Sequence, residues 1–101
     1  MITFNELLER AKTEKIAIHT PTEKQAKALL KALDEKGYVW LTETKLTTET
    51  WYEYEENTCY DFYDGVGKLL DKKVCFSPLK FYKKCGRTII EFKDIDFKEE
   101  L

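Results

Sequence analysis

The chain has 101 residues, of which 43% are hydrophobic and 36% are charged, so it can fill one hydrophobic core but is too short for two. Its 17 lysines and arginines are balanced by 19 aspartates and glutamates, and this net charge of −2 argues against a nucleic-acid-binding protein, which carries a basic excess. No stretch approaches the roughly 20 apolar residues of a membrane span, so we expect one cytoplasmic domain, residues 1–101, with no membrane partner.

The N-terminal part of the chain predicts a short helix followed by a strand. Thr3 and Glu6 have the spacing of a capping box, so we expect a helix over residues 3–12. Residues 16–18, Ile-Ala-Ile, are apolar and partly β-branched, which is typical of a short buried strand. The helix is expected to pack against the core that this strand enters.

The clearest helix of the sequence comes next. We expect Thr20 as its N-cap, Pro21 at its first helical position, Glu23 as the partner in the capping box, and Gly37 as its stop. Residues 38–41 then alternate as a strand would. The order strand, helix, strand predicts a β-α-β unit whose helix covers one face of a sheet.

The middle of the chain predicts a loop, a short helix and a hairpin. Residues 42–50 are polar and rich in threonine, which indicates a loop. The aromatic residues 51–57 fit either one helical turn or the start of a strand, and the helix is favoured. Two strands, residues 58–63 and 73–76, are predicted to pair as a hairpin that turns at Asp64–Gly65 and has a long polar tip.

The C-terminal part predicts one more helix and one more strand. Residues 79–84 are expected to form a short helix that Gly86 ends, and residues 87–92 a strand, before an acidic tail that is half ordered. Together these elements predict an α+β fold. It is a single small domain with a mixed, mostly antiparallel sheet and two to three helices mainly on one face.

Three cysteines and one histidine are the candidates for metal or nucleophilic chemistry. Cys59, Cys75 and Cys85 are 16 and 10 positions apart, whereas zinc sites almost always contain a close cysteine pair. A cysteine nucleophile would need His19 beside it as a base, and the four glycines never have the spacing of a phosphate-binding loop. We therefore expect no metal, no cofactor, no disulfide and no enzymatic activity.

Aromatic residues are dense between positions 40 and 82, and about a third of them are expected to be exposed. Exposed Trp and Tyr rings give large contact areas and stack on bases, so they indicate a protein interface or a nucleotide pocket. Beside them, the turn over residues 82–87 carries three cations, which fits either an anionic ligand or an ordinary polar loop. The aromatic residues are Trp40, Trp51, Tyr52, Tyr54, Tyr60, Phe62, Tyr63, Phe76, Phe81 and Tyr82.

Three segments of the chain carry a family resemblance. They read TPTEKQAKALLKALDEKGYVW, LTTETWYEYEENTCYDF and KVCFSPLKFYKKCGRTIIEFKDI. In this order they resemble small proteins encoded by phages and prophages of low-GC Gram-positive bacteria, over roughly residues 16–95. Some proteins of similar organisation look like anti-Thoeris sponges, which bind cyclic ADP-ribose-type signals at subunit interfaces without cleaving them. The resemblance implies a homo-oligomer, in the cytoplasm of the infected host cell, that sequesters a cyclic nucleotide-type immune signal.

The resemblance also implies where a ligand would bind. Trp51, Tyr54 and Asn57 would lie near the pocket, and Lys84 and Arg87 would face the phosphates of the ligand. The predicted ligand- or partner-binding residues are Trp51, Tyr54, Asn57, Tyr82, Lys84 and Arg87.

A phage-encoded inhibitor that covers a host protein, such as an anti-CRISPR or another host-takeover protein, fits the same residues. The acidic segment from Glu43 to Asp64 could imitate nucleic acid for a DNA-binding partner. A sponge should form tight oligomers and bind nucleotides, whereas an inhibitor should bind a macromolecule and ignore nucleotides. The expected partner is therefore a cyclic nucleotide-type molecule or a host defence protein, with no direct nucleic-acid partner.

Overall fold

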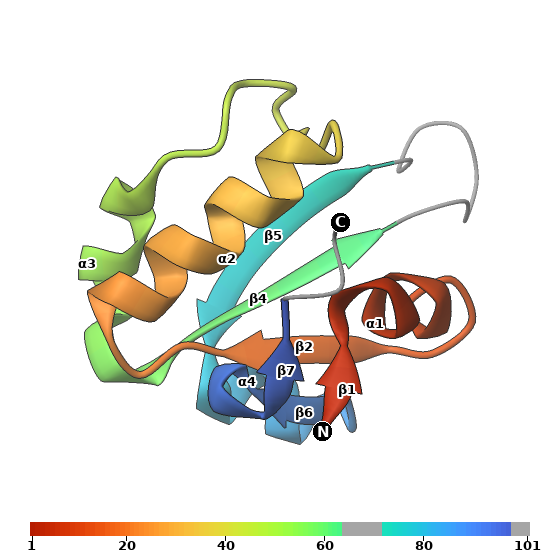
Figure 1. Cartoon of the computed structure of the whole chain (residues 1–101). Coiled ribbons are helices and arrows are strands. Elements are labelled where there is room, and N and C mark those ends of the chain that lie inside the picture. The colour runs from red at the N-terminus through yellow and green to blue at the C-terminus, as the bar shows by residue number, and fades with distance from the viewer. Residues whose placement is uncertain (64–71, 98–101) are drawn as a thin grey trace.

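A mixed sheet of five strands forms the centre of the domain in a computed structural model that describes residues 1–63 and 72–97 (Figure 1). The strands are β2 (Ile16–His19), β3 (Val39–Trp40), β4 (Thr58–Tyr63), β5 (Lys73–Pro78) and β6 (Thr88–Glu91). They lie in the order β3-β5-β4-β2-β6. β4 is antiparallel to β2 and β5, and each outer strand is parallel to its neighbour. The predicted α+β class and mixed sheet are confirmed.

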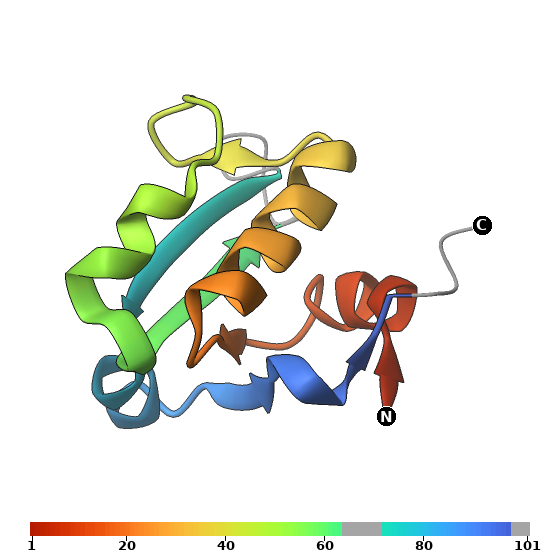
Figure 2. The same cartoon turned by 60° about the vertical axis from the view of Figure 1, so that its left-hand side comes forward.

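Helices cover the two faces of the sheet unequally. They are α1 (Phe4–Arg10), α2 (Glu23–Glu35), α3 (Trp51–Tyr54) and α4 (Leu79–Lys84). α1 and α2 lie on one face, with α3 beside the first turns of α2, and Figure 2 shows α4 on the opposite side of the strands. The prediction of helices mainly on one face is confirmed.

The alternation of side chains along the strands builds two cores. Ile16, Ile18 and Tyr60 are buried toward α1 and α2, whereas Ala17 and Cys59 are buried toward α4. Successive residues of a strand point to opposite faces, so one strand can serve both cores. β4 therefore has a buried residue on each face, and its polar residues must find partners inside the protein.

The two ends of the chain meet in a second, small sheet. β1 (Ile2–Thr3) pairs in parallel with β7 (Ile95–Asp96), which follows the short 3₁₀ helix Phe92–Asp94. The ring of Phe97 then packs 5.1 Å from that of Phe4. The sequence did not predict this pairing, because strands of two residues have no detectable period. Residues 98–101 of the predicted half-ordered tail lie outside the described residues.

The N-cap of α2 differs from the prediction. Thr22 caps the helix by accepting a hydrogen bond from the backbone N–H of Gln25 over 3.2 Å. Thr20, the predicted cap, is fully buried, and its hydroxyl donates instead to the carbonyl of Thr58 over 3.1 Å. Because the hydroxyl of Thr20 bonds to a distant strand, it does not cap the helix. Gly37 does follow the end of α2, with φ +90.

Most other local predictions are confirmed. Thr3 and Glu6 form the capping box of α1, and residues 51–57 are helical, since the 3₁₀ helix η2 (Glu55–Asn57) follows α3 directly. β4 and β5 form the predicted hairpin, whose expected turn at Asp64–Gly65 lies outside the described residues. Within the described part of the chain, no helix is long and apolar enough to cross a membrane.

Candidate functional site

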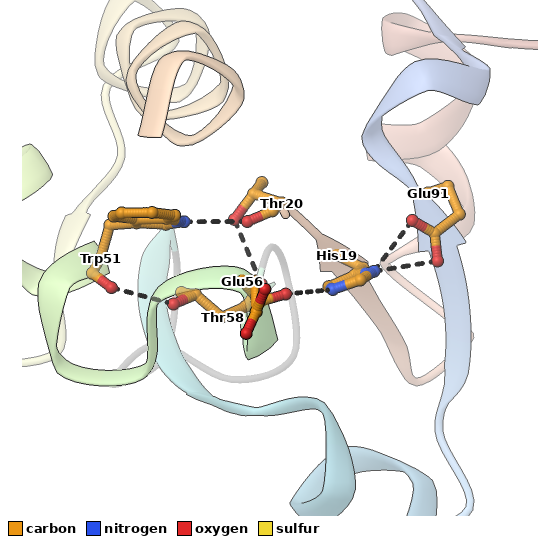
Figure 3. Close-up of polar contacts among 6 residues, drawn as sticks. All are labelled: His19, Thr20, Trp51, Glu56, Thr58 and Glu91. Atoms are coloured by element: carbon orange, nitrogen blue, oxygen red, sulfur yellow. Dashed lines mark hydrogen bonds and ion pairs between the residues drawn. The ribbon is translucent and has the colours of Figure 1, made fainter. Parts of the chain in front are cut away.

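Hydrogen bonds hold the α3–η2 segment, residues 51–57, against the end of β2 (Figure 3). The indole N–H of Trp51 donates to the carbonyl of Thr20 over 2.9 Å. The hydroxyl of Thr58 donates to the carbonyl of Trp51 over 3.1 Å. On the other side, Nε2 of His19 lies 2.8 Å from the carbonyl oxygen of Glu56. The segment is thus fixed near both of its ends.

His19 also faces a carboxylate. Its Nδ1 lies 2.9 and 3.0 Å from the two carboxylate oxygens of Glu91 in β6. The imidazole is only 13% exposed. One side chain therefore connects β2, β6 and the α3–η2 segment, as Figure 3 shows.

The junction of α3 and η2 has a strained backbone. Glu55 has φ 48 and ψ −123, close to the first central position of a type II′ turn, where glycine is preferred because it has no Cβ. Such conformations in other residues cost on the order of 1–3 kcal/mol and persist only where neighbours enforce them. The hydrogen bonds of Trp51 and Glu56 lie on either side of this residue and enforce it.

Glu55→Gly is expected to raise the free energy of unfolding by about 1 kcal/mol, because relief of strain exceeds the added flexibility of the unfolded chain. The Glu55 side chain is exposed, so its loss removes no buried contact. Glu53→Gly, in the helical part of the segment, is the control and should instead lower stability by up to about 1 kcal/mol. Urea unfolding measures both, and equal destabilisation by the two changes would contradict strain at Glu55.

The α3–η2 segment borders an extended aromatic groove. One hollow of about 470 Å³ is lined by Glu53, Tyr54, Asn57, Pro78 and Lys80. A second hollow, of about 360 Å³, is lined mainly by Trp40, Leu41, Thr50, Val74, Cys75 and Phe76. The two hollows are neighbours, because the ring centroid of Phe76 in the second lies 5.9 Å from that of Tyr54 in the first and 5.7 Å from that of Trp40. We call the two hollows together the aromatic groove.

The border of the aromatic groove is acidic. Residues 42–57 contain five glutamates and one lysine. The glutamates, all exposed, are Glu43, Glu49, Glu53, Glu55 and Glu56. Nearby cations are Lys80, which lines the first hollow, and Lys73, whose Nζ lies 3.7 Å from Glu43. Residues 42–57 therefore form a mainly negative rim along the groove, and Glu53 is the glutamate of this segment that lines a hollow.

Three of the six predicted site residues belong to this region. Tyr54 and Asn57 line the groove, and Trp51 lies half-buried behind it with its indole N–H bonded to Thr20. Trp40 and Phe76 also line the groove, although the sequence predicts no place for them in the site. No sequence pattern indicates that β3 and β5, far apart in the chain, are neighbours in the sheet.

Two other predicted residues, Tyr82 and Arg87, contact the buried carboxylate of Asp61, which the sequence does not mark as a site residue. The hydroxyl of Tyr82 donates to Oδ1 of Asp61 over 2.7 Å, and Nη2 of Arg87 lies 3.2 Å from Oδ2. The guanidinium also lies over the Tyr82 ring, 5.5 Å from its centroid. Asp61 is 2% exposed, and burial together with this carboxylate raises the pKa of Tyr82 above its ordinary value. The only sequence signal for Asp61 is its place on the opposite face from Tyr60.

The predicted residues thus form two groups at opposite ends of β4. Asn57 precedes the first residue of that strand, whereas Arg87 lines a hollow of about 200 Å³ with Phe62, near its end. The four steps from Thr58 to Phe62 span about 13 Å at roughly 3.3 Å per residue. Lys84 is exposed in the last turn of α4. The two groups do not line one common hollow among those found in the described residues.

Cys59 is the thiol that lies opposite His19, across the paired strands β2 and β4. The three cysteines are free; Cys59 is buried and Cys85 is exposed. Burial raises the pKa of Cys59 to about 12 and that of Cys75 to about 11, which disfavours the nucleophilic thiolate. No group of three or more His, Cys, Asp or Glu side chains that could hold a metal occurs among residues 1–63 and 72–97.

Compared with known proteins, the chain matches no family model, no curated protein sequence and no solved structure.

Proposed function

We propose that this chain is a non-enzymatic binding protein that sequesters a partner protein, and that the aromatic groove is its binding surface. The observation that carries the proposal is the run of ring contacts from Trp40 through Phe76 to Tyr54, which lines two neighbouring hollows beside the acidic segment 42–57. Trp and Tyr are the residues most enriched among those that dominate the energetics of protein interfaces.

The charge of the rim supports a basic partner. Five exposed glutamates and one lysine within residues 42–57 produce a negative field that attracts lysine- or arginine-rich surfaces and repels phosphates. An apolar side chain of the partner would occupy the hollow between Trp40 and Phe76, and its cations would face the rim. Surfaces of this kind are typical of proteins that bind nucleic acid.

The resemblance to phage proteins gives this partner a biological setting. An acidic surface that occupies the nucleic-acid-binding face of a host defence protein would block it by competition and without chemistry. The protein would then act in the cytoplasm of the infected cell as an inhibitor.

Sequestration of a cyclic nucleotide-type signal is the second candidate function. It is favoured by the hollow of about 360 Å³ beside Trp40 and Phe76, whose rings could stack on a base. Lys80 could then face a phosphate of the ligand, and a homo-oligomer could bring Arg87 from another subunit, because Arg87 of the same chain lies near the other end of β4.

Selection of peptides from a random display library on the immobilised protein tests the proposed function. Selected sequences should place lysine or arginine next to an aromatic or aliphatic residue. Tyr54→Ala should weaken their binding at least about tenfold, whereas Tyr52→Ala should leave it unchanged. Tyr52 is a matched control, because it lies in the same helix but its hydroxyl bonds to Glu23 of α2.

Three outcomes would overturn the proposal of a basic protein partner. The first is the selection of acidic peptides, and the second is equal loss of binding in both tyrosine variants. The third is uptake of a discrete, unmodified ligand from a panel of cyclic dinucleotides, cyclic trinucleotides and cyclic ADP-ribose isomers in native mass spectrometry, which would support the second candidate instead.

A further inference from the structure

We infer that His19 is the positioning residue of the aromatic groove, and that a proton held between His19 and Glu91 fixes the α3–η2 segment in its binding conformation. Binding by the groove would then weaken as the pH rises. This inference rests on the proposed function, since it concerns the wall that carries Tyr54 and Asn57.

The hydrogen-bond partners of the imidazole supply the first argument. Nε2 lies 2.8 Å from the carbonyl of Glu56, and a carbonyl oxygen can only accept. Nδ1 lies 2.9 and 3.0 Å from the oxygens of Glu91, and an ionised carboxylate can only accept. Both ring nitrogens therefore carry hydrogens, or the Glu91 carboxyl is protonated and donates to Nδ1. In either case the pair holds one proton more than a neutral imidazole beside a carboxylate.

Few of the groups that face His19 carry a charge that could substitute for the positive charge of this proton. Glu91 approaches from β6, and the residue opposite His19 in β4 is Cys59, whose raised pKa of about 12 keeps it neutral near pH 7. From α4, Lys83 is close enough to Cys59 to act against that rise in its pKa. From η2, Glu56 contributes its carbonyl, while its carboxylate belongs to an exposed side chain.

Loss of the proton would break one bond in particular. Hydrogen bonds to a charged group are about twice as strong as neutral ones, so the remaining hydrogen should stay on Nδ1 facing Glu91. Nε2 would then present a lone pair to the carbonyl of Glu56, and the two acceptors would repel each other. The α3–η2 segment would lose its attachment at the strained end, directly after Glu55.

The direction of the pH effect follows from these bonds. The His19–Glu91 pair holds the additional proton when the α3–η2 segment is attached and lacks it when the segment is detached. Low pH therefore favours attachment. Attachment of the segment, and with it binding by the groove, should therefore weaken as the pH rises.

Amide hydrogen exchange of the free protein, followed by mass spectrometry, tests the inference without any partner. After correction for the intrinsic pH dependence of exchange, protection of residues 52–57 should fall about tenfold between pH 5.5 and 8, as expected for one lost hydrogen bond. His19→Gln should remove this pH dependence, and so should Glu91→Gln, with far-UV circular dichroism showing that each variant folds.

Glu56→Gln is the matched control. It neutralises the side chain but keeps the carbonyl that His19 contacts, so its pH dependence should equal that of the unchanged protein. Protection that is constant with pH, or that changes equally in His19→Gln, would overturn the inference while leaving the groove intact as a binding surface. If Tyr54→Ala and Tyr52→Ala instead lose peptide binding equally while protection still falls with pH as expected, only the proposed function is contradicted.

Discussion

Asp61→Ala is expected to lower the free energy of unfolding by about 3–5 kcal/mol, the usual cost of removing one partner of a buried ion pair. Asp61 is 2% exposed, accepts a hydrogen bond from Tyr82 and pairs with Arg87. Without this carboxylate, the largely buried guanidinium of Arg87 and the buried hydroxyl of Tyr82 lose these interactions. Urea unfolding followed by tryptophan fluorescence measures the loss.

Two further variants show whether the loss comes from the ion pair. Asp94→Ala, at an exposed position, should change stability by no more than about 0.5 kcal/mol. Adding Arg87→Met to Asp61→Ala should recover part of the lost stability, because the unpaired charge is gone. A loss below about 1 kcal/mol for Asp61→Ala would contradict a buried ion pair between Asp61 and Arg87.

Raising the pH above 9 is expected to destabilise the domain steadily. Burial raises the pKa of Cys59 to about 12, of Cys75 to about 11 and of Tyr60 to about 12, from ordinary values of 9.0, 9.0 and 10.0. Above pH 9 the unfolded chain therefore binds fewer protons than the folded one, so the free energy of unfolding falls. The slope is about 1.4 kcal/mol per pH unit for each proton.

The stability from these buried groups is fully present below about pH 9 and is lost as the pH rises toward 12. Urea unfolding at a series of pH values gives the slope. Cys59→Ala should make it shallower, whereas Cys85→Ala, at an exposed position, should leave it unchanged. A stability that is flat between pH 9 and 11 would contradict the burial of these groups.

Much of the fold could be predicted because its signals are local. The capping box of Thr3 and Glu6, the stop at Gly37 and the alternation over residues 58–63 each depend on neighbours in the sequence. The N-cap of α2 was predicted wrongly because the hydroxyl of Thr20 bonds to Thr58, 38 positions later. Propensity rules do not include such tertiary contacts.

The candidate site was predictable only in part, for the same physical reason. The aromatic and acidic composition of residues 51–57 is visible in the sequence, and Tyr54 and Asn57 do line the groove. The strand order brings Phe76 of the second hollow against Tyr54 of the first, and it brings His19 within reach of Glu56. Asp61 likewise gains its significance only from α4, which folds over it after the hairpin.

A titration of isotope-labelled protein with a selected basic peptide, followed by nuclear magnetic resonance, tests the central claim most directly. The largest shift changes should occur at Tyr54, Asn57, Phe76 and the indole N–H of Trp40. At the same peptide concentration the remaining changes should be much smaller in Tyr54→Ala, as expected for binding about tenfold weaker, and they should be retained in Tyr52→Ala. Shift changes that cluster instead on α1 and β6, away from the aromatic groove, would contradict the claim that this groove is the binding surface.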